Sequence, residues 1–234
     1  MAERFTEHLR QEAAGLWEAQ HQHPFVRGIG DGTLGVERFK FWLRQDYVFL
    51  IEYARLLALA AARSPDLETM IRFAALLKET VGTEMNLHRA YAAEFEITRE
   101  ELERELPAPT TRGYTDFLLR VGAVGDFAEL AAALLPCMWA FSEIGQRLAA
   151  QPAPDEKRYA KWIAMYSSRE FAELALWCRN LLDRLAAGLP EHDLQKLEAA
   201  FLTSSRYECS SGRWLERWNG GQYNWCAVLR RGGR

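Results

Sequence analysis

The stretch Leu134-Leu135-Pro136-Cys137-Met138-Trp139-Ala140-Phe141 lies within a longer apolar segment that has helical periodicity. Pro136 lacks a backbone N–H and its ring displaces the carbonyl of residue 132, so we expect a kink or a new helical run there. Cys137 follows at once, with Trp139 and Phe141 close by. A lone cysteine in such a segment is usually a small buried hydrophobe. Two interpretations of Cys137 therefore stay open at this point, a core residue and a nucleophile.

The segment around this stretch is one of several with a helical pattern. We expect a helix over residues 126–150, and apolar residues at three- and four-residue steps predict others over 4–22, 36–62, 66–95, 114–121, 155–187 and from 191 onward. The glycine-rich run 25–34 and the polar run 98–112 are expected to be connections. Neither a strand pattern, a fixed repeat nor a long linker is found. The sequence therefore predicts one all-α domain, a multi-helix bundle of about seven or eight helices.

Composition narrows the class of protein. The 234 residues are 49% hydrophobic and 26% charged, which is typical of a soluble globular chain. The net charge of −3 gives no basic excess to neutralise phosphates, so no nucleic-acid partner is expected. We find no apolar run of roughly 18 residues, and the charged N-terminus lacks a signal-peptide core, so no membrane association is expected. Four cysteines without Cys-x-x-Cys spacing argue against a disulfide framework and predict a cytoplasmic protein.

Polar side chains interrupt the apolar faces of the expected helices. A bundle core is where such side chains converge. Asp46 stands on an apolar stripe, where a carboxylate must be paired or serve a task; an ion pair with Arg44 or Arg55 and a functional role are both open. To act as a nucleophile, the thiol of Cys137 would need a neighbouring group that raises its thiolate fraction. Each candidate comes from a different helix: Asp46, Glu84, Tyr114, Cys137, Tyr166 and Glu208, with Phe49, Trp139 and Phe141 as stacking walls.

Glu84 and His88 invite a metal interpretation because they stand four residues apart and can touch. A di-iron bundle, however, needs Glu-x-x-His on two helices, and no expected helix carries that motif. His21 and His23 likewise lack a carboxylate or cysteine partner at ligand spacing. We therefore expect no metal, and we favour a Glu84–His88 hydrogen bond that ties two helices together.

Short motifs in a fixed order give the chain a family resemblance. They are His23-Pro24-Phe25, the run Gly28 to Leu34, Phe39 through Gln45-Asp46-Tyr47, Glu84 with His88, Tyr114-Thr115, Leu135-Pro136-Cys137-Met138-Trp139 with Glu143-Ile144-Gly145, Trp162-Ile163 with Tyr166, and Ser204-Ser205-Arg206-Tyr207-Glu208. Each is weak alone, but the ordered set spans nearly everything from residue 23 to 208. The chain resembles the TenA family, thiaminase II, in its cysteine-containing branch. That family has an all-α, haem-oxygenase-like architecture.

The resemblance implies a specific hydrolysis. Such enzymes convert 4-amino-5-aminomethyl-2-methylpyrimidine, and thiamin less efficiently, to the hydroxymethylpyrimidine. By position, Cys137 would add to the ring and help expel the group on the exocyclic methylene, after which water adds and the thiolate leaves. Glu208 would protonate a ring nitrogen, Asp46 would bind the aminopyrimidine edge and Tyr166 would sit by the thiol. The ring pocket would be lined by Phe49, Tyr114, Trp139 and Phe141. The family also implies a homotetramer without metal or cofactor. Glu84 and His88 would hold in position the residues that contact the substrate.

The sequence departs from the family pattern in two places. Relatives often carry Tyr at the positions of Phe49 and Phe141, which leaves the preferred aminopyrimidine open. After Glu208, relatives continue with a helix resembling Leu-Phe-Trp-Glu-Met-Ala, whose Phe lines the pocket. Here the chain instead reads Cys209-Ser210-Ser211-Gly212-Arg213-Trp214-Leu215. Codons for Ser-Ser-Gly-Arg-Trp-Leu, read two nucleotides out of step, can encode the family's motif. We therefore expect a helical domain over 1–208 and an atypical tail over 209–234, produced by a frameshift.

Two other classes of function stay open at this stage. One is another haem-oxygenase-like protein, either a cofactor-handling oxidase of the PQQ-synthesis type or a haem oxygenase with His8, His21 or His23 as its proximal ligand. The other is a non-catalytic regulatory protein that binds a partner. Hydrolysis of an aminopyrimidine that depends on Cys137 would separate the enzyme from both.

Overall fold

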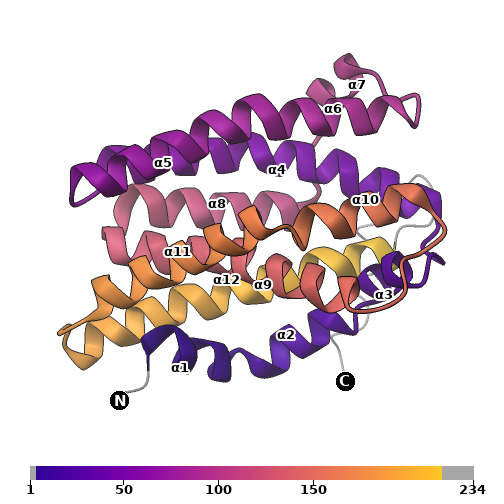
Figure 1. Ribbon diagram of the computed structural model, residues 1–234. Coiled ribbons are helices and arrows are strands. Elements are labelled where there is room, and N and C mark those ends of the chain that lie inside the picture. The colour runs from indigo at the N-terminus through magenta and orange to yellow at the C-terminus, as the bar shows by residue number, and fades with distance from the viewer. Residues whose placement is uncertain (1–3, 218–234) are drawn as a thin grey trace, which may run out of the picture.

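The computed structural model describes residues 4–217, with side chains through residue 210. Within this range every regular element is helical, which confirms the all-α prediction (Figure 1). The elements are α1 Phe5–Glu12, α2 Ala14–His21, α3 Pro24–Gly30, α4 Val36–Arg63, α5 Leu67–Glu79, the π-helical turn η1 Thr80–Glu84, α6 Met85–Ala93, α7 Arg99–Arg104, α8 Pro109–Val124, α9 Phe127–Ala149, α10 Lys157–Tyr166, α11 Arg169–Ala186 and α12 Glu191–Arg217.

Helix α9 is the centre of the bundle and packs against α8, α10, α11 and α12. It continues through Pro136 from Phe127 to Ala149, so the proline does not begin a new helical run. By length and composition α9 could cross a membrane, but 67% of its most apolar window is buried inside the bundle. It is therefore a core helix.

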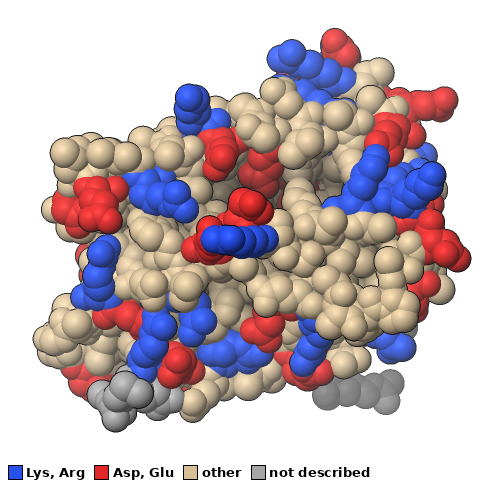
Figure 2. Space-filling view, viewed as in Figure 1, with Lys and Arg blue, Asp and Glu red and all other residues tan. Residues whose placement is uncertain are grey.

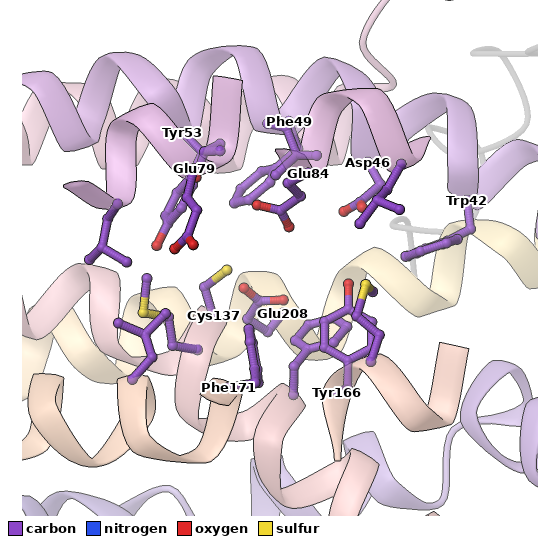
Figure 3. A pocket seen from close by; sticks show the side chains of 18 of the residues that line it. Trp42, Asp46, Phe49, Tyr53, Glu79, Glu84, Cys137, Tyr166, Phe171 and Glu208 are labelled. Atoms are coloured by element: carbon purple, nitrogen blue, oxygen red, sulfur yellow. The ribbon is translucent and has the colours of Figure 1, made fainter. Parts of the chain in front are cut away.

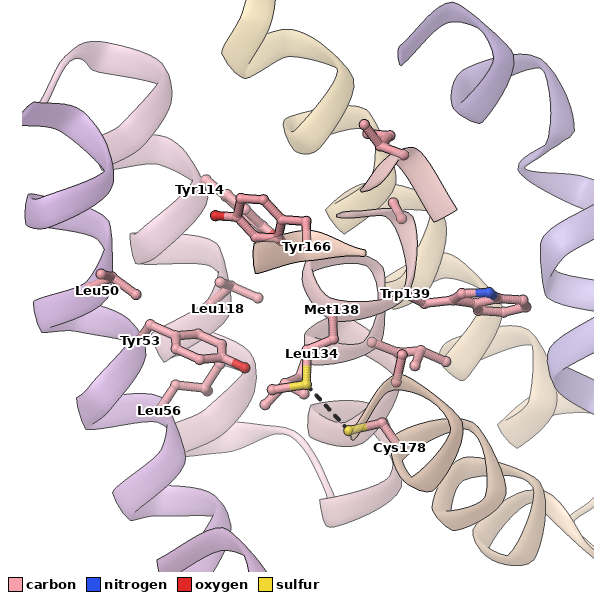
Figure 4. Packing of buried hydrophobic residues seen from close by; sticks show 14 of the residues in the cluster. Leu50, Tyr53, Leu56, Tyr114, Leu118, Leu134, Met138, Trp139, Tyr166 and Cys178 are labelled. Carbon is pink, nitrogen blue, oxygen red and sulfur yellow. Dashed lines mark hydrogen bonds between the residues drawn. The ribbon is translucent and has the colours of Figure 1, made fainter. Parts of the chain in front are cut away.

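The core around α9 is formed by side chains from several helices. Figure 4 shows Leu134 and Met138 of α9 facing Leu56 of α4 and Leu118 of α8. The thiol of Cys178 in α11 lies 3.4 Å from the thioether sulfur of Met138. Cys178 is thus a buried packing residue of the kind that a lone cysteine most often is.

Local capping explains where the observed helices differ from the expected ones. The run 25–34 was expected to be a loop, but α3 begins there because His23 accepts a hydrogen bond from the amide of Phe25 (3.1 Å) and Pro24 fits the first helical turn. The run 98–112 likewise holds α7, which starts at a reciprocal cap between Thr98 and Glu101, and the beginning of α8. The expected helix 4–22 is divided into α1 and α2 at residue 13.

The break between α10 and α11 determines the position of Tyr166. A single helix was expected over 155–187, but Ser168 caps a new helix by accepting a hydrogen bond from the amide of Phe171 (3.2 Å). The break lies against Gly145 of α9, where a β-carbon would collide with the backbone of Tyr166 and Ser167. Because Gly145 has no β-carbon, the turn can approach α9 closely, and this close approach fixes the position of Tyr166.

The last helix extends further than the sequence suggested. Helix α12 runs past Glu208 to Arg217, so the expectation that helical structure ends at residue 208 is wrong for the next nine residues. Cys209 is buried there. The expectations about residues 218–234 lie outside the described residues.

Candidate active site

A cavity of about 610 Å³ lies between α4, η1, α8, α9, α12 and the break between α10 and α11. Figure 3 shows its walls from close by, and Figure 2 shows acidic side chains in and beside a hollow on the same face of the molecule. The structure brings together here most of the residues singled out from the sequence. Those that line the cavity are Asp46, Phe49, Glu84, Tyr114, Cys137, Phe141, Tyr166 and Glu208.

Trp139 does not belong to this cavity, which corrects its expected role as a stacking wall. Cys137 and Phe141 are one helical turn apart and share a face, whereas Trp139 is two residues from each and therefore points to the other side of α9. Its ring packs edge-on against Trp17 (5.0 Å between centroids) and lies under the guanidinium of Arg179 (4.1 Å). Trp139 is a core residue that joins α9 to α2 and α11.

Glu208 and Tyr114 form the polar centre of the cavity. The Tyr114 hydroxyl donates to Oε1 of Glu208 at 2.8 Å, and its oxygen is also 2.8 Å from the hydroxyl of Ser204. Because the phenol has one hydrogen, Ser204 must donate to Tyr114. The Cys137 thiol also hydrogen-bonds to Glu208. Two donors from α8 and α9 therefore hold the carboxyl group of α12 in place.

The protonation states of this centre follow from burial. Burial raises the pKa of Glu208 to about 7, although its hydrogen bond with Tyr114 acts in the opposite direction. Burial, followed by the charge of Glu208, raises the pKa of the Cys137 thiol well above its usual value. Cys137 therefore rests as a thiol, and the adjacent carboxylate is the base that can take its proton.

Asp46 is held by His88, and neither Arg44 nor Arg55 pairs with it. The Nε2 atom of His88 lies 2.6 Å from Oδ2 of Asp46, and Nδ1 lies 3.1 Å from the backbone carbonyl of Glu84. Because both neighbours are acceptors, both ring nitrogens donate and the imidazole is charged. Burial alone would lower the pKa of His88, but the hydrogen bond and charge of Asp46 outweigh it and raise that pKa.

The arginines considered as partners of Asp46 pair elsewhere: Arg44 pairs with Glu105 (3.3 Å) and Arg55 pairs with Glu52.

The expected hydrogen bond between the side chains of Glu84 and His88 is wrong. The side chain of Glu84 turns into the cavity, and only its backbone carbonyl contacts the imidazole. The bond that ties helices together is thus His88 to Asp46, which joins α6 to α4.

Aromatic side chains form further parts of the cavity wall. Phe49 stacks on Tyr114 with 5.4 Å between ring centroids, and Phe141 contacts Tyr166 at 5.0 Å. Figure 3 shows Tyr166 across the cavity from Asp46, with Glu208 nearer to Cys137. The group beside the thiol is therefore Glu208, and Tyr166 faces the end of the cavity that contains Asp46.

Sequence reasoning missed three polar groups of the site. Tyr53 lines the cavity one turn after Phe49, and Glu79 lines it from the end of α5. Ser204 stands one turn before Glu208 and completes its hydrogen-bond chain. The spacing of Tyr53 from Phe49 and of Ser204 from Glu208 could have indicated both, because residues four apart share a helix face.

The histidines considered as haem ligands lie outside this cavity. His8 pairs with Glu198 (3.0 Å), and His21 lies 3.2 Å from Glu143. His23 caps α3 through its Nδ1 atom. Among the described residues, no group of three or more His, Cys, Asp or Glu side chains is arranged to hold a metal ion.

The chain is similar to known proteins over most of its length. Residues 10–211 match the model of the TENA/THI-4/PQQC family. The chain is similar to the aminopyrimidine aminohydrolase of Halalkalibacterium halodurans, with 48% identity over 87% of this chain and 92% of the relative.

Solved structures show the same architecture. The TenA homologue from P. horikoshii superposes with a TM-score of 0.84 at 27% identity, covering 92% of this chain and 99% of that one. A domain with a haem-oxygenase-like fold from Shewanella denitrificans superposes with a TM-score of 0.70 at 15% identity, covering 97% and 96%. The haem-oxygenase-like architecture expected from the sequence is therefore confirmed.

Proposed function

Because the chain belongs to the TENA/THI-4/PQQC family, we propose that it is an aminopyrimidine aminohydrolase of thiamin salvage. Its substrate is 4-amino-5-aminomethyl-2-methylpyrimidine, with thiamin as a poorer one, and its product is the hydroxymethylpyrimidine. The observation that carries the proposal is the Cys137 thiol hydrogen-bonded to a buried carboxyl group, Glu208, in a cavity that Asp46 also lines.

The chemistry begins with a proton transfer. The ionised Glu208 takes the thiol proton of Cys137 and passes it to a ring nitrogen, while sulfur forms a bond to the ring carbon beside the substituted one. The pKa of about 7 suits Glu208 to both tasks, since it accepts and releases a proton near neutral pH. The hydrogen bond from Tyr114 keeps the carboxyl group aimed at both partners.

The leaving group then departs from the exocyclic methylene. The ring electrons form a carbon–carbon double bond to that methylene as the carbon–nitrogen bond breaks, and the ammonium group leaves as ammonia. Water adds to the methylene and loses a proton, the ring nitrogen returns its proton to Glu208, and the carbon–sulfur bond breaks to release the product. Asp46, charged and fixed by His88, would bind the aminopyrimidine edge throughout.

The aromatic walls suit a flat heterocycle. Phe49 and Phe141 both line the cavity, and a pyrimidine bound there would stack its faces on aromatic rings. The cavity volume of about 610 Å³ also leaves space beyond one small ring, as thiamin, a poorer substrate with two linked rings, would require.

One assay tests this function directly. Ammonia release from the aminomethylpyrimidine should be measured for the wild type, for Cys137→Ser and for the matched control Cys178→Ser, whose thiol is buried outside the cavity. We expect Cys137→Ser to lose about three orders of magnitude or more of kcat, because a weak nucleophile replaces the reacting group, and the control to stay active. A folded wild type without activity, or an active Cys137→Ser, would contradict the proposal.

We also infer a cytoplasmic homotetramer. The support for assembly is a set of exposed apolar side chains along α5, η1 and α6, namely Leu67, Ile71, Val81 and Leu87, each at least 52% exposed. The support for a reducing compartment is that Cys137, Cys178 and Cys209 carry free thiols. Light scattering coupled to size exclusion tests the assembly, and a monomer at micromolar concentration would overturn it.

We further propose that a frameshift follows Glu208. The family match stops at residue 211, so the last 23 of the 234 residues lie outside it. Resequencing the locus or measuring the intact mass of the native protein tests this point. A confirmed in-frame tail would refute it, without bearing on the chemistry of the cavity.

A further inference from the structure

The cavity has a second polar region that the proposed chemistry does not use. Figure 3 shows Glu84 beside Phe49 on the wall opposite Cys137, and Tyr53 and Glu79 pointing into the cavity at the end away from Trp42. Glu84 is at the end of η1, the single π-helical turn in the described part of the chain. Such turns are frequent at functional sites, because one extra residue redirects the side chains that follow.

The cavity is strongly acidic. Among the described residues that line it there are six carboxyl groups and one guanidinium group, that of Arg72. Burial, and then the nearby charge of Asp46, raise the pKa of Glu84 to about 7. A positively charged ligand would lower the energy of the ionised carboxylates and would be drawn into the cavity.

Glu84 is positioned by the same hydrogen-bonded unit that fixes Asp46. Its backbone carbonyl accepts from Nδ1 of His88 (3.1 Å), and Nε2 of that imidazole donates to Asp46 (2.6 Å). One imidazole therefore links the backbone of Glu84 to the carboxylate of Asp46. This is the arrangement expected if Asp46 and Glu84 bind two neighbouring groups of one ligand.

Tyr53 supplies an independent indication that a polar group belongs in this region. Its side chain is 5% exposed and lines the cavity, yet its hydroxyl has no hydrogen-bond partner within the described part of the chain. Buried hydroxyl groups are nearly always satisfied. A ligand that carries several N–H donors would supply the missing partner.

We propose that Glu84, assisted by Tyr53, is the subsite for the ammonium group on the exocyclic methylene, and that it selects cationic aminomethyl substrates over neutral ones. The inference rests on the proposed function, since it assigns the leaving-group end of that same site. Primary alkylamines are protonated at neutral pH, so the substrate brings a charge that one carboxylate can pair with directly. The neutral hydroxymethyl product has no such charge and is held less tightly.

The test is a binding comparison in the Cys137→Ser background, where no turnover disturbs the measurement. Calorimetry gives Kd for the aminomethylpyrimidine and for the neutral hydroxymethylpyrimidine. We expect Glu84→Gln to weaken binding of the amine at least tenfold and of the alcohol less than twofold. The matched control is Glu103→Gln, whose carboxylate lies outside the cavity lining, is about half exposed and pairs with Arg99 (2.6 Å), and which should change neither constant by more than twofold.

A second variant keeps the inference testable if Glu84→Gln proves unstable. Tyr53→Phe removes a hydroxyl that has no partner in the described structure, so its melting temperature should stay the same or rise. It should weaken binding of the amine about threefold and leave the alcohol unchanged. If Glu84→Gln and Tyr53→Phe weaken both ligands equally, or neither, the subsite is not there. Ammonia release by the wild type reports separately on the proposed function, and the ratio of the two Kd values decides this inference whether or not the enzyme turns over.

Discussion

Replacing Glu208 by glutamine should inactivate the protein and also stabilise it at alkaline pH. Glu208 is 6% exposed, and burial raises its pKa from the usual 4.5 to about 7. The folded state therefore holds this proton more tightly than the unfolded state does. Stability falls as pH rises from 4.5 to about 7, and the loss is complete above that range.

The size of the effect follows from the shift. A pKa raised from 4.5 to about 7 corresponds to about 3 kcal/mol, which is the cost of an ionised Glu208 in the fold. Glutamine never ionises, but it replaces one acceptor oxygen with an NH2 group, which cannot accept from the donors Tyr114 and Cys137. We therefore expect a gain of about 2 kcal/mol at pH 8.5, or roughly 4–8 °C in melting temperature, and no gain at pH 5.

Thermal unfolding followed by circular dichroism at pH 5, 7 and 8.5 measures this difference. The control is Glu173→Gln, which removes a carboxylate that is 56% exposed and should show a small difference that does not change with pH. A stability difference between Glu208→Gln and the wild type that is the same at all three pH values would refute the reasoning, as would a variant that is relatively less stable at pH 8.5. Loss of ammonia release at every pH completes the expected result, because the base for Cys137 is gone.

Three further substitutions probe the site and its surroundings. Tyr114→Phe removes a donor to Glu208 and so raises the pKa of that carboxyl group, which should move the ascending limb of kcat/KM upward by about one pH unit; an unmoved limb in the pH–rate profile contradicts this role. His88→Gln takes away the charged donor at 2.6 Å from Asp46, so steady-state kinetics should show KM raised about tenfold with a smaller change in kcat. Trp139→Phe should lower the free energy of unfolding by about 1–3 kcal/mol in urea titrations and leave KM unchanged, whereas a raised KM would place its ring at the substrate.

The sequence determined the helical class of this protein and most of the side chains that meet in its cavity. Apolar residues at three- and four-residue steps identify a buried helix face without reference to the rest of the fold. Polar residues that interrupt such a face must find partners or ligands, which is why the helical pattern alone singles out Asp46, Tyr114, Cys137 and Glu208. The same periodicity applied more strictly would have removed Trp139, because it lies two residues from Cys137 on the same helix.

Only the tertiary structure decided which helix faces oppose each other. The pair His88–Asp46 joins residues 42 positions apart, and the near-neutral pKa of Glu208 arises from burial that α8, α9 and α12 create together. The place of Tyr166 depends on a serine cap and on one glycine in a neighbouring helix. A sequence pattern fixes the direction of a side chain relative to its own helix axis, but the rotation and offset of helices against each other come from packing and caps. For that reason the candidate residues could be named from the sequence, whereas their partners, protonation states and opposing walls could not.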